Sequence, residues 1–164
     1  MSGIMNLANP SGLLKNLQHE SALFAQDPND SYAAINALRD AYHLREWIWH
    51  DRLQADAGLQ TRVMGAPGNE AAWNTWVNSN CNDFKLVREL CNGSKHFEPD
   101  TNGVIQGFER STLSGGARLS DNFKTSDASF YVRDKNNIAK RIADIVSNVE
   151  TFWRKLFHDH PGLA

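Results

Sequence analysis

The stretch SYAAINALRDAYHLREWIWHD, residues 31–51, carries the strongest helical signal of the sequence. Two rows of apolar side chains recur along it at the three- and four-residue steps of an α-helix. The rows are Ala34, Leu38, Ala41, Leu44 and Ile48, and beside them Ile35, Tyr42 and Trp49. An apolar stripe this wide predicts a central helix, from about Ser31 to Asp56, with neighbours on two sides.

Four further helices are predicted around the central one. They run from about Ser11 to Ala25, from Glu70 to about Asn78, from near Asn80 toward Gly93, and from Ile138 along an apolar stripe to Leu156. The spacing of Asn80 and Asp83 resembles a capping box at the start of the third of these helices. Residues 57 to 68 hold three glycines and a proline, which predicts a loop. Residues 158 to 164 are expected to fray.

Residues 99 to 134 differ in character from the rest of the chain. Gly, Ser, Thr, Asn and Asp punctuate short apolar runs there, which fits a small β-hairpin or meander laid on the helices, or a long irregular excursion. The predicted fold class is therefore all-α: an antiparallel helical bundle with a small β-like insertion before the last helix. With 164 residues, we expect one domain over the whole length.

Charge, cysteine content and hydropathy limit the cellular setting and the partners to be expected of this protein. The net charge of −2 gives no global basic field, so any contact with nucleic acid has to be local. Cys81 and Cys91 lie ten residues apart on one predicted helix, about 15 Å along its axis, which is too far for a disulfide. Reduced thiols fit a cytoplasmic protein. Because neither a signal peptide nor a run long enough for a membrane span is visible, we expect no membrane association.

The stretch RELCNGSKHF, residues 88–97, gathers side chains able to act on a phosphate. Arg88 supplies a bidentate fork and Lys95 a point charge. His96 can move a proton near neutral pH, while Asn92 and Ser94 orient a ligand by hydrogen bonds. Such a set can cut RNA without a metal. The alternative is structural: solvated Arg88 and Lys95, Asn92 capping the helix end, and His96 bound to a carbonyl.

A second polar group follows one stripe of the central helix. Asp40, His43, Glu46 and His50 recur at steps of three, three and four residues. His43, Glu46 and His50 are weak candidates for a three-ligand metal site. The alternative is two helix-supporting pairs, Asp40 with His43 and Glu46 with His50. Trp47 lies on the same stripe and is a candidate for a dimer surface, because interfaces are enriched in aromatic residues.

An arginine followed by a histidine late in one helix of a small all-α bundle resembles the HEPN superfamily. Seven residues separate Arg88 from His96, a wider spacing than that family's usual motif. Leu90, Asn92, Lys95 and His96 are also similar to a Leu-x-Asn-x-x-Lys-His motif of uncharacterised bacterial helical proteins. The resemblance implies a helical homodimer. Many HEPN proteins are metal-independent ribonucleases of toxin–antitoxin or phage-defence systems, and others bind nucleotides or partners without catalysis.

Two functions are expected from these observations. The first is a metal-independent endoribonuclease without a cofactor, in which His96 and His43 carry protons, Arg88 and Lys95 hold the phosphate, and Asn92 and Ser94 position it. The second is a non-catalytic helical dimer that binds a protein or a nucleotide. There the stripe with Trp47 would form the partner surface.

Overall fold

The structure, a computed structural model, describes residues 9–93, 105–112, 128–134 and 138–164. Six α-helices and three strands follow one another in this part of the chain. They are α1 (Pro10–Gln26), α2 (Ser31–Ile48), α3 (Ala57–Met64), α4 (Glu70–Asn80), α5 (Phe84–Gly93), β1 (Ile105–Thr112), β2 (Ala128–Asp134), β3 (Ala139–Arg141) and α6 (Ile142–Asp159). A π-helical turn, Trp49–Leu53, continues α2, and a short 3-10 turn, Pro161–Leu163, follows α6.

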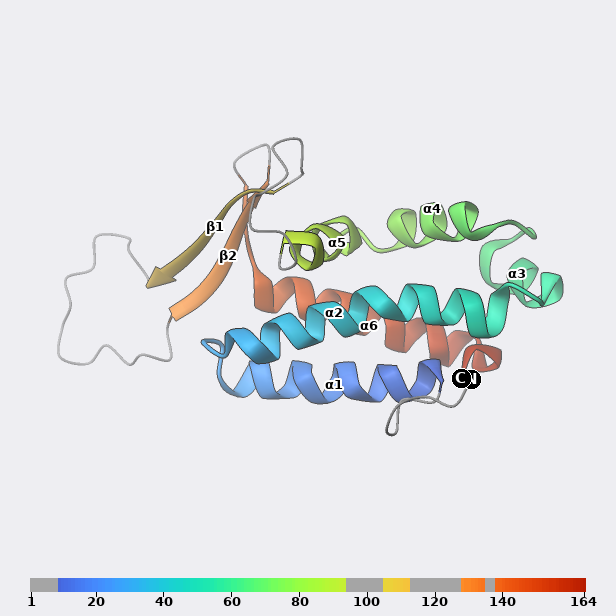
Figure 1. The fold of residues 1–164 in the computed structure, drawn as a ribbon, viewed down its shortest axis with the longest axis horizontal. Coiled ribbons are helices and arrows are strands. Elements are labelled where there is room, and N and C mark those ends of the chain that lie inside the picture. Colours follow the sequence, from blue (N-terminus) through green and yellow to red (C-terminus); the bar gives the residue numbers. More distant parts are fainter. Residues whose placement is uncertain (1–8, 94–104, 113–127, 135–137) are drawn as a thin grey trace.

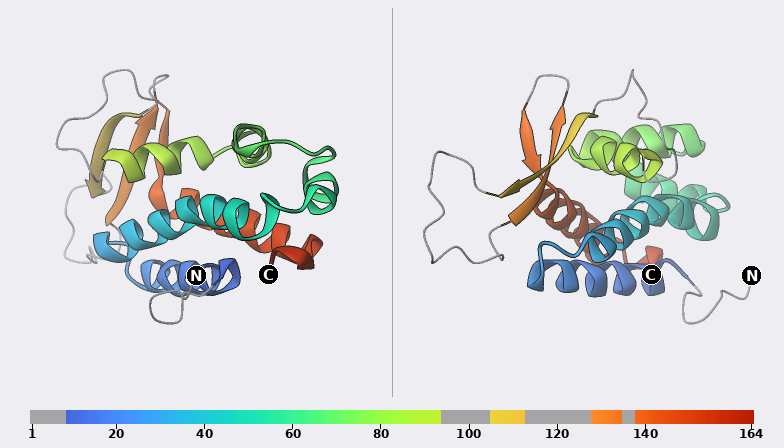
Figure 2. Two further views of the ribbon diagram at one scale, coloured as in Figure 1. Left: turned by 45° about the vertical axis from the view of Figure 1, so that its right-hand side comes forward. Right: turned by 60° about the vertical axis from the view of Figure 1, so that its left-hand side comes forward.

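The helices form a bundle with α2 at its centre (Figure 1). α2 packs against α1, α5 and α6, so the predicted central helix with neighbours on two sides is confirmed. α1 returns along α2 as an antiparallel partner, while α4 and α5 cross above α2 and α6 (Figures 1 and 2). The strands lie between α5 and α6 in the chain. The predicted class, an all-α antiparallel bundle with a small β insertion before the last helix, is correct.

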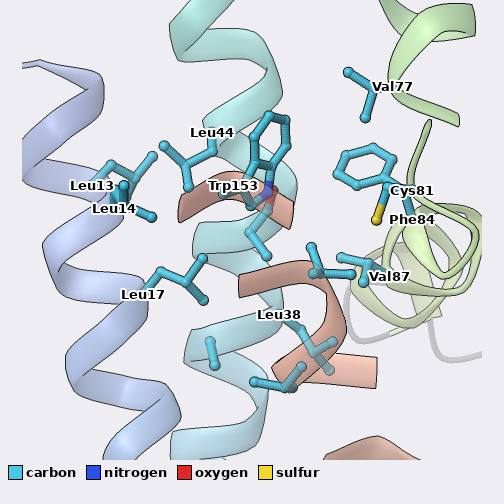
Figure 3. Close-up of a cluster of buried hydrophobic side chains, with 14 of the residues drawn as sticks. Leu13, Leu14, Leu17, Leu38, Leu44, Val77, Cys81, Phe84, Val87 and Trp153 are labelled. Carbon is cyan, nitrogen blue, oxygen red and sulfur yellow. The ribbon is translucent and has the colours of Figure 1, made fainter. Parts of the chain in front are cut away.

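Two buried tryptophans, one on α6 and one on α4, form hydrogen bonds to the backbone of α2. The indole Nε1 of Trp153, in α6, donates to the carbonyl of Ala41 at 3.0 Å, and that of Trp73, in α4, donates to the carbonyl of Arg45 at 2.8 Å. These carbonyls lie one turn apart on α2. Figure 3 shows Trp153 among leucines of α1 and α2 and beside Phe84 of α5. Burying both indole N–H groups with a partner lets these large rings fill the core without an unsatisfied donor.

The small sheet is antiparallel throughout, in the order β1-β2-β3. β2 packs against α6, and Val132 of β2 belongs to the buried core. A buried carboxylate also ties the sheet to the bundle. Asp83, just before α5, accepts from Lys140 Nζ of β3 at 2.5 Å and from Asn148 Nδ2 of α6 at 2.8 Å. This triad therefore fixes where α5 begins relative to α6 and the sheet.

The loop predicted for residues 57 to 68 is largely a helix, α3, and the prediction is wrong there. Asp56 caps α3 by accepting from the backbone N–H of Leu59 at 2.7 Å. The helix ends at Gly65, whose φ of 85° suits a residue without a side chain. The side chain of buried Gln60 then closes the turn before α4. Its Nε2 donates to the carbonyl of Leu53 at 2.7 Å, and its Oε1 accepts from the backbone N–H of Gly68 at 2.8 Å.

Two other predicted boundaries also move. α6 begins at Ile142 because the preceding Ala139–Arg141 pairs with β2 as a strand, and this leaves Ile138 exposed. The end of the chain does not fray in the way predicted, since Leu163 is fully buried by the 3-10 turn.

The capping box is wrong as well. Asn80 ends α4 and donates back to the carbonyl of Trp76 at 2.8 Å, and the side chain of Asp83 binds the triad instead. The two cysteines consequently belong to different segments, with Cys81 after α4 and Cys91 in α5. Both cysteines are buried, and neither takes part in a disulfide.

Candidate functional site

The exposed side of α5 carries the two predicted phosphate-site residues that the structure describes. Val87 and Cys91 are buried on the inner side of the helix. Arg88 and Asn92 follow them by one position and stand one turn apart, with 43% of the Arg88 side chain accessible and Asn92 exposed. The guanidinium Nη2 of Arg88 lies 3.7 Å from Glu89 Oε1. An arginine and an amide are thus presented together to solvent, and the acidic neighbour partly balances the arginine's charge.

The remaining members of that stretch lie outside the described residues. These are Ser94, Lys95 and His96, which follow directly after Gly93, the last residue of α5. Their placement as proton carrier and phosphate ligands stays a prediction.

His43 of α2 forms a carboxylate pair within its own helix. Its Nδ1 lies 3.2 Å from Glu46 Oε2, and both side chains are about half-buried. The other oxygen of the same carboxylate, Glu46 Oε1, accepts from Arg45 Nη2 at 3.3 Å. Glu46 therefore bridges an imidazole and a guanidinium.

This arrangement determines which nitrogen of His43 is available for chemistry. An ionised carboxylate only accepts hydrogen bonds, so a hydrogen bond from a neutral His43 to Glu46 requires the proton on Nδ1. Nε2 then carries the lone pair, and it has no hydrogen-bond partner in the described part of the chain. An oriented imidazole with a free acceptor nitrogen can take a proton from a hydroxyl that approaches it.

Tyr42 connects this pair to α5. Its ring stacks on Phe84, the first residue of α5, with centroids 6.3 Å apart, and meets the ring of His43 edge-on at 5.4 Å. α2 and α5 are therefore in direct contact beside His43. No hydrogen bond or ion pair joins His43 to Arg88, both of which are described, so the two predicted site residues belong to neighbouring helices without touching through polar groups.

The weak metal candidates are not brought together. His43 and Glu46 are paired, whereas His50 Nδ1 lies 3.1 Å from Gln54 Oε1. Across residues 9–93 and the described later segments, no group of three His, Cys, Asp or Glu side chains converges. The predicted helix pairs also differ from those observed, because Glu46 pairs with His43 and not with His50.

Asp40 turns toward α1 and accepts from Asn16 Nδ2 at 2.6 Å. Burial raises the pKa of the Asp40 carboxyl, and the Asn16 hydrogen bond and the charge of His43 oppose that rise. Asp40 is thus part of the α1–α2 contact, and its hydrogen bond goes to Asn16 and not to the His43–Glu46 pair.

Trp47, expected on a partner surface, packs partly buried against the core. The residue that the sequence reasoning missed is Arg45, which is 9% exposed. The sequence does contain a sign that Arg45 is buried. Arg45 lies three residues after Tyr42 and four before Trp49, so this charged side chain occupies a position in an apolar row of the helix.

Comparisons with family models, curated proteins and solved structures returned no match for this chain. Among the described residues, no helix has both the length and the apolar character needed to cross a bilayer.

Proposed function

We propose that this protein is a metal-independent endoribonuclease, HEPN-like and homodimeric, of the kind used in toxin or defence systems. One observation carries the proposal: a half-exposed histidine, His43, is held at Nδ1 by a carboxylate and keeps Nε2 free, on a helix packed against the one that presents Arg88. The resemblance of residues 88–96 to the HEPN motif supplies the substrate class. The donor set supports the absence of a metal from the reaction, because imidazole and guanidinium suffice for phosphoryl transfer within RNA.

The reaction is an internal transesterification. A histidine takes the proton of a 2′-hydroxyl, the 2′-oxygen bonds to the adjacent phosphorus, and the bond from phosphorus to the 5′-oxygen breaks. A second histidine returns a proton to that leaving oxygen. His43 and His96 are the two proton carriers, and Arg88 and Lys95 stabilise the negative charge that builds up on the phosphate. Asn92 and Ser94 position it by hydrogen bonds. The products are a 2′,3′-cyclic phosphate and a 5′-hydroxyl.

The test is incubation of mixed RNAs with the full chain in excess chelator. We expect cleavage by the wild type and its loss in His96→Ala and Arg88→Ala, each with a thermal midpoint close to wild type. His43→Ala should slow cleavage by roughly 10²-fold or more, the contribution of a positioned acid or base. Matched controls are His19→Ala and Arg62→Ala, which remove exposed side chains of the same types on α1 and α3. Cleavage that survives His96→Ala, or an unfolded His96→Ala, would overturn the catalytic assignment.

The second candidate is non-catalytic partner binding, and the start of α2 favours it. Tyr32 is 81% exposed, and Ile35, three residues further on and therefore beside it on the helix, is also exposed. Exposed apolar neighbours of this kind suit a partner surface. Binding of RNA or of a second chain without any cleavage in the same assay selects this function.

A further inference from the structure

We infer that Arg45 is a positioning residue for His43, acting through Glu46; the inference rests on the proposed function for its catalytic meaning. This role accounts for a buried guanidinium that the fold does not otherwise require.

Arg45 is held in a fixed place by its surroundings. Its backbone carbonyl accepts from the Trp73 indole at 2.8 Å. Its guanidinium lies 4.8 Å from the centroid of the Tyr42 ring, a cation–π contact, and Nη2 is 3.5 Å from the Tyr42 hydroxyl. Nε has no hydrogen-bond partner among the described residues. A buried guanidinium with an unsatisfied nitrogen is costly, and an apolar side chain of similar volume would often suit such a position as well or better. Stability alone therefore does not explain Arg45.

Glu46 gains its orientation from this fixed charge. A glutamate with a half-exposed side chain has several rotamers in water, and immobilising it costs conformational entropy. The contact of Oε1 with Arg45 Nη2 selects the rotamer in which Oε2 reaches His43 Nδ1. The pair at three residues' spacing therefore forms in preference to the pair with His50 at four residues' spacing, which the helix geometry equally allows.

The consequence for His43 is a single tautomer and a single ring orientation. With Oε2 accepting at Nδ1, the proton of the neutral ring stays there and Nε2 remains the acceptor. Without Arg45, Glu46 is free to turn to solvent, and the ring loses the partner that selects its tautomer. The guanidinium itself touches neither substrate nor reacting atoms, so its effect is on orientation.

The tautomer of His43 can be measured without RNA, by long-range proton–nitrogen NMR at a pH where histidines are neutral. The chain has six histidines, and His43→Ala identifies the signals of His43. We expect the Nδ1–H pattern in the wild type. Arg45→Met, Arg45→Gln and Glu46→Ala should each shift His43 toward the Nε2–H form. Two different replacements of Arg45 keep the test valid if one of them fails to fold. Arg52→Met is the matched control, because Arg52 is also on this helical segment but pairs with Asp51.

Cleavage rates then connect the tautomer to function. For Arg45→Met we expect a fall in kcat on the order of tenfold, a fraction of what a positioned acid or base contributes, with KM nearly unchanged. A folded Arg45 variant that keeps the wild-type His43 spectrum, while Glu46→Ala loses it, overturns the inference. If the Arg45 variants do shift the tautomer but His43→Ala cleaves RNA at the wild-type rate, the positioning of His43 stands and its role in the proposed function fails.

Discussion

Replacing Asp83 by alanine tests how the candidate site is held in place. Asp83 is 5% exposed and immediately precedes α5, the helix that presents Arg88. Its carboxylate accepts one bond from Lys140 of β3 and one from Asn148 of α6. Hydrogen bonds to a charged group contribute about 1.5–3 kcal/mol each. The Lys140 side chain is 43% exposed and regains hydration in the variant, so its bond counts for less, about 0.5–1 kcal/mol.

Removing the carboxylate also removes the cost of burying it, which offsets part of the loss. We therefore expect Asp83→Ala to lower the free energy of unfolding by about 2 kcal/mol. Urea unfolding followed by tryptophan fluorescence measures this directly, since Trp73 and Trp153 are fully buried. The slope of the transition should stay unchanged, because the surface exposed on unfolding is nearly the same.

Asp144→Ala is the matched control for Asp83→Ala. Asp144 also makes an ion pair, with Arg141, but both side chains are about half-exposed, so we expect a loss of no more than about 0.5–1 kcal/mol. A double-mutant cycle of Asp83→Ala with Asn148→Ala should give a coupling energy of about 1 kcal/mol, since the two residues share a bond. Equal losses for Asp83→Ala and Asp144→Ala, with no coupling to Asn148, would show that the buried triad adds no stability beyond an exposed ion pair.

Two further predictions concern single titratable groups. Burial raises the pKa of the Cys81 thiol to about 11, and Cys91 is also buried. We therefore expect a thiol reagent at neutral pH to label neither cysteine in the folded protein and both in urea, whereas rapid labelling of folded protein would contradict this. Burial also raises the pKa of Asp40 above its usual 3.8. The folded state then holds that proton more tightly than the unfolded state, so the stability of the wild type falls as pH rises from 3.8 through the higher folded value. Asp40→Asn can still accept from Asn16 and should be more stable than wild type at pH 7. That advantage should vanish below pH 3.8, and a difference independent of pH would exclude this cause.

Most of the fold could be predicted from hydrophobic periodicity, and the errors have physical causes. α2 and α6 each bury a continuous apolar stripe, so local spacing is sufficient to find them. The sequence does not predict α3, because Gly58 and the glycines and proline after Met64 are typical of a loop. The helix is short, and Asp56 caps it. The start of α6 was misplaced because Ile138 continues the helical period, while pairing of β3 with the distant β2 decides the conformation. Tertiary contacts override local preference at that point.

The sequence singles out residues for the candidate site, but it does not reveal the contacts among them. Residue types and helical spacing suffice to single out His43, Glu46 and Arg88. Helical geometry allows Glu46 to reach either His43 or His50. In the structure Glu46 contacts Arg45 and His43, while His50 pairs with Gln54. Arg45 also accepts, at its backbone carbonyl, the indole hydrogen bond of Trp73 from α4. Packing of this kind joins residues distant in sequence, and periodicity does not reveal it.

Analysis of the RNA ends produced by the purified full chain in excess chelator is the decisive experiment for the proposed ribonuclease. A mechanism that uses imidazoles and cations, with the 2′-hydroxyl as nucleophile, predicts fragments with 2′,3′-cyclic phosphate and 5′-hydroxyl ends. Mass spectrometry identifies both ends, and the His96→Ala protein prepared in parallel should yield none. Intact RNA, cleavage that requires added metal, or the same ends from His96→Ala would contradict the account.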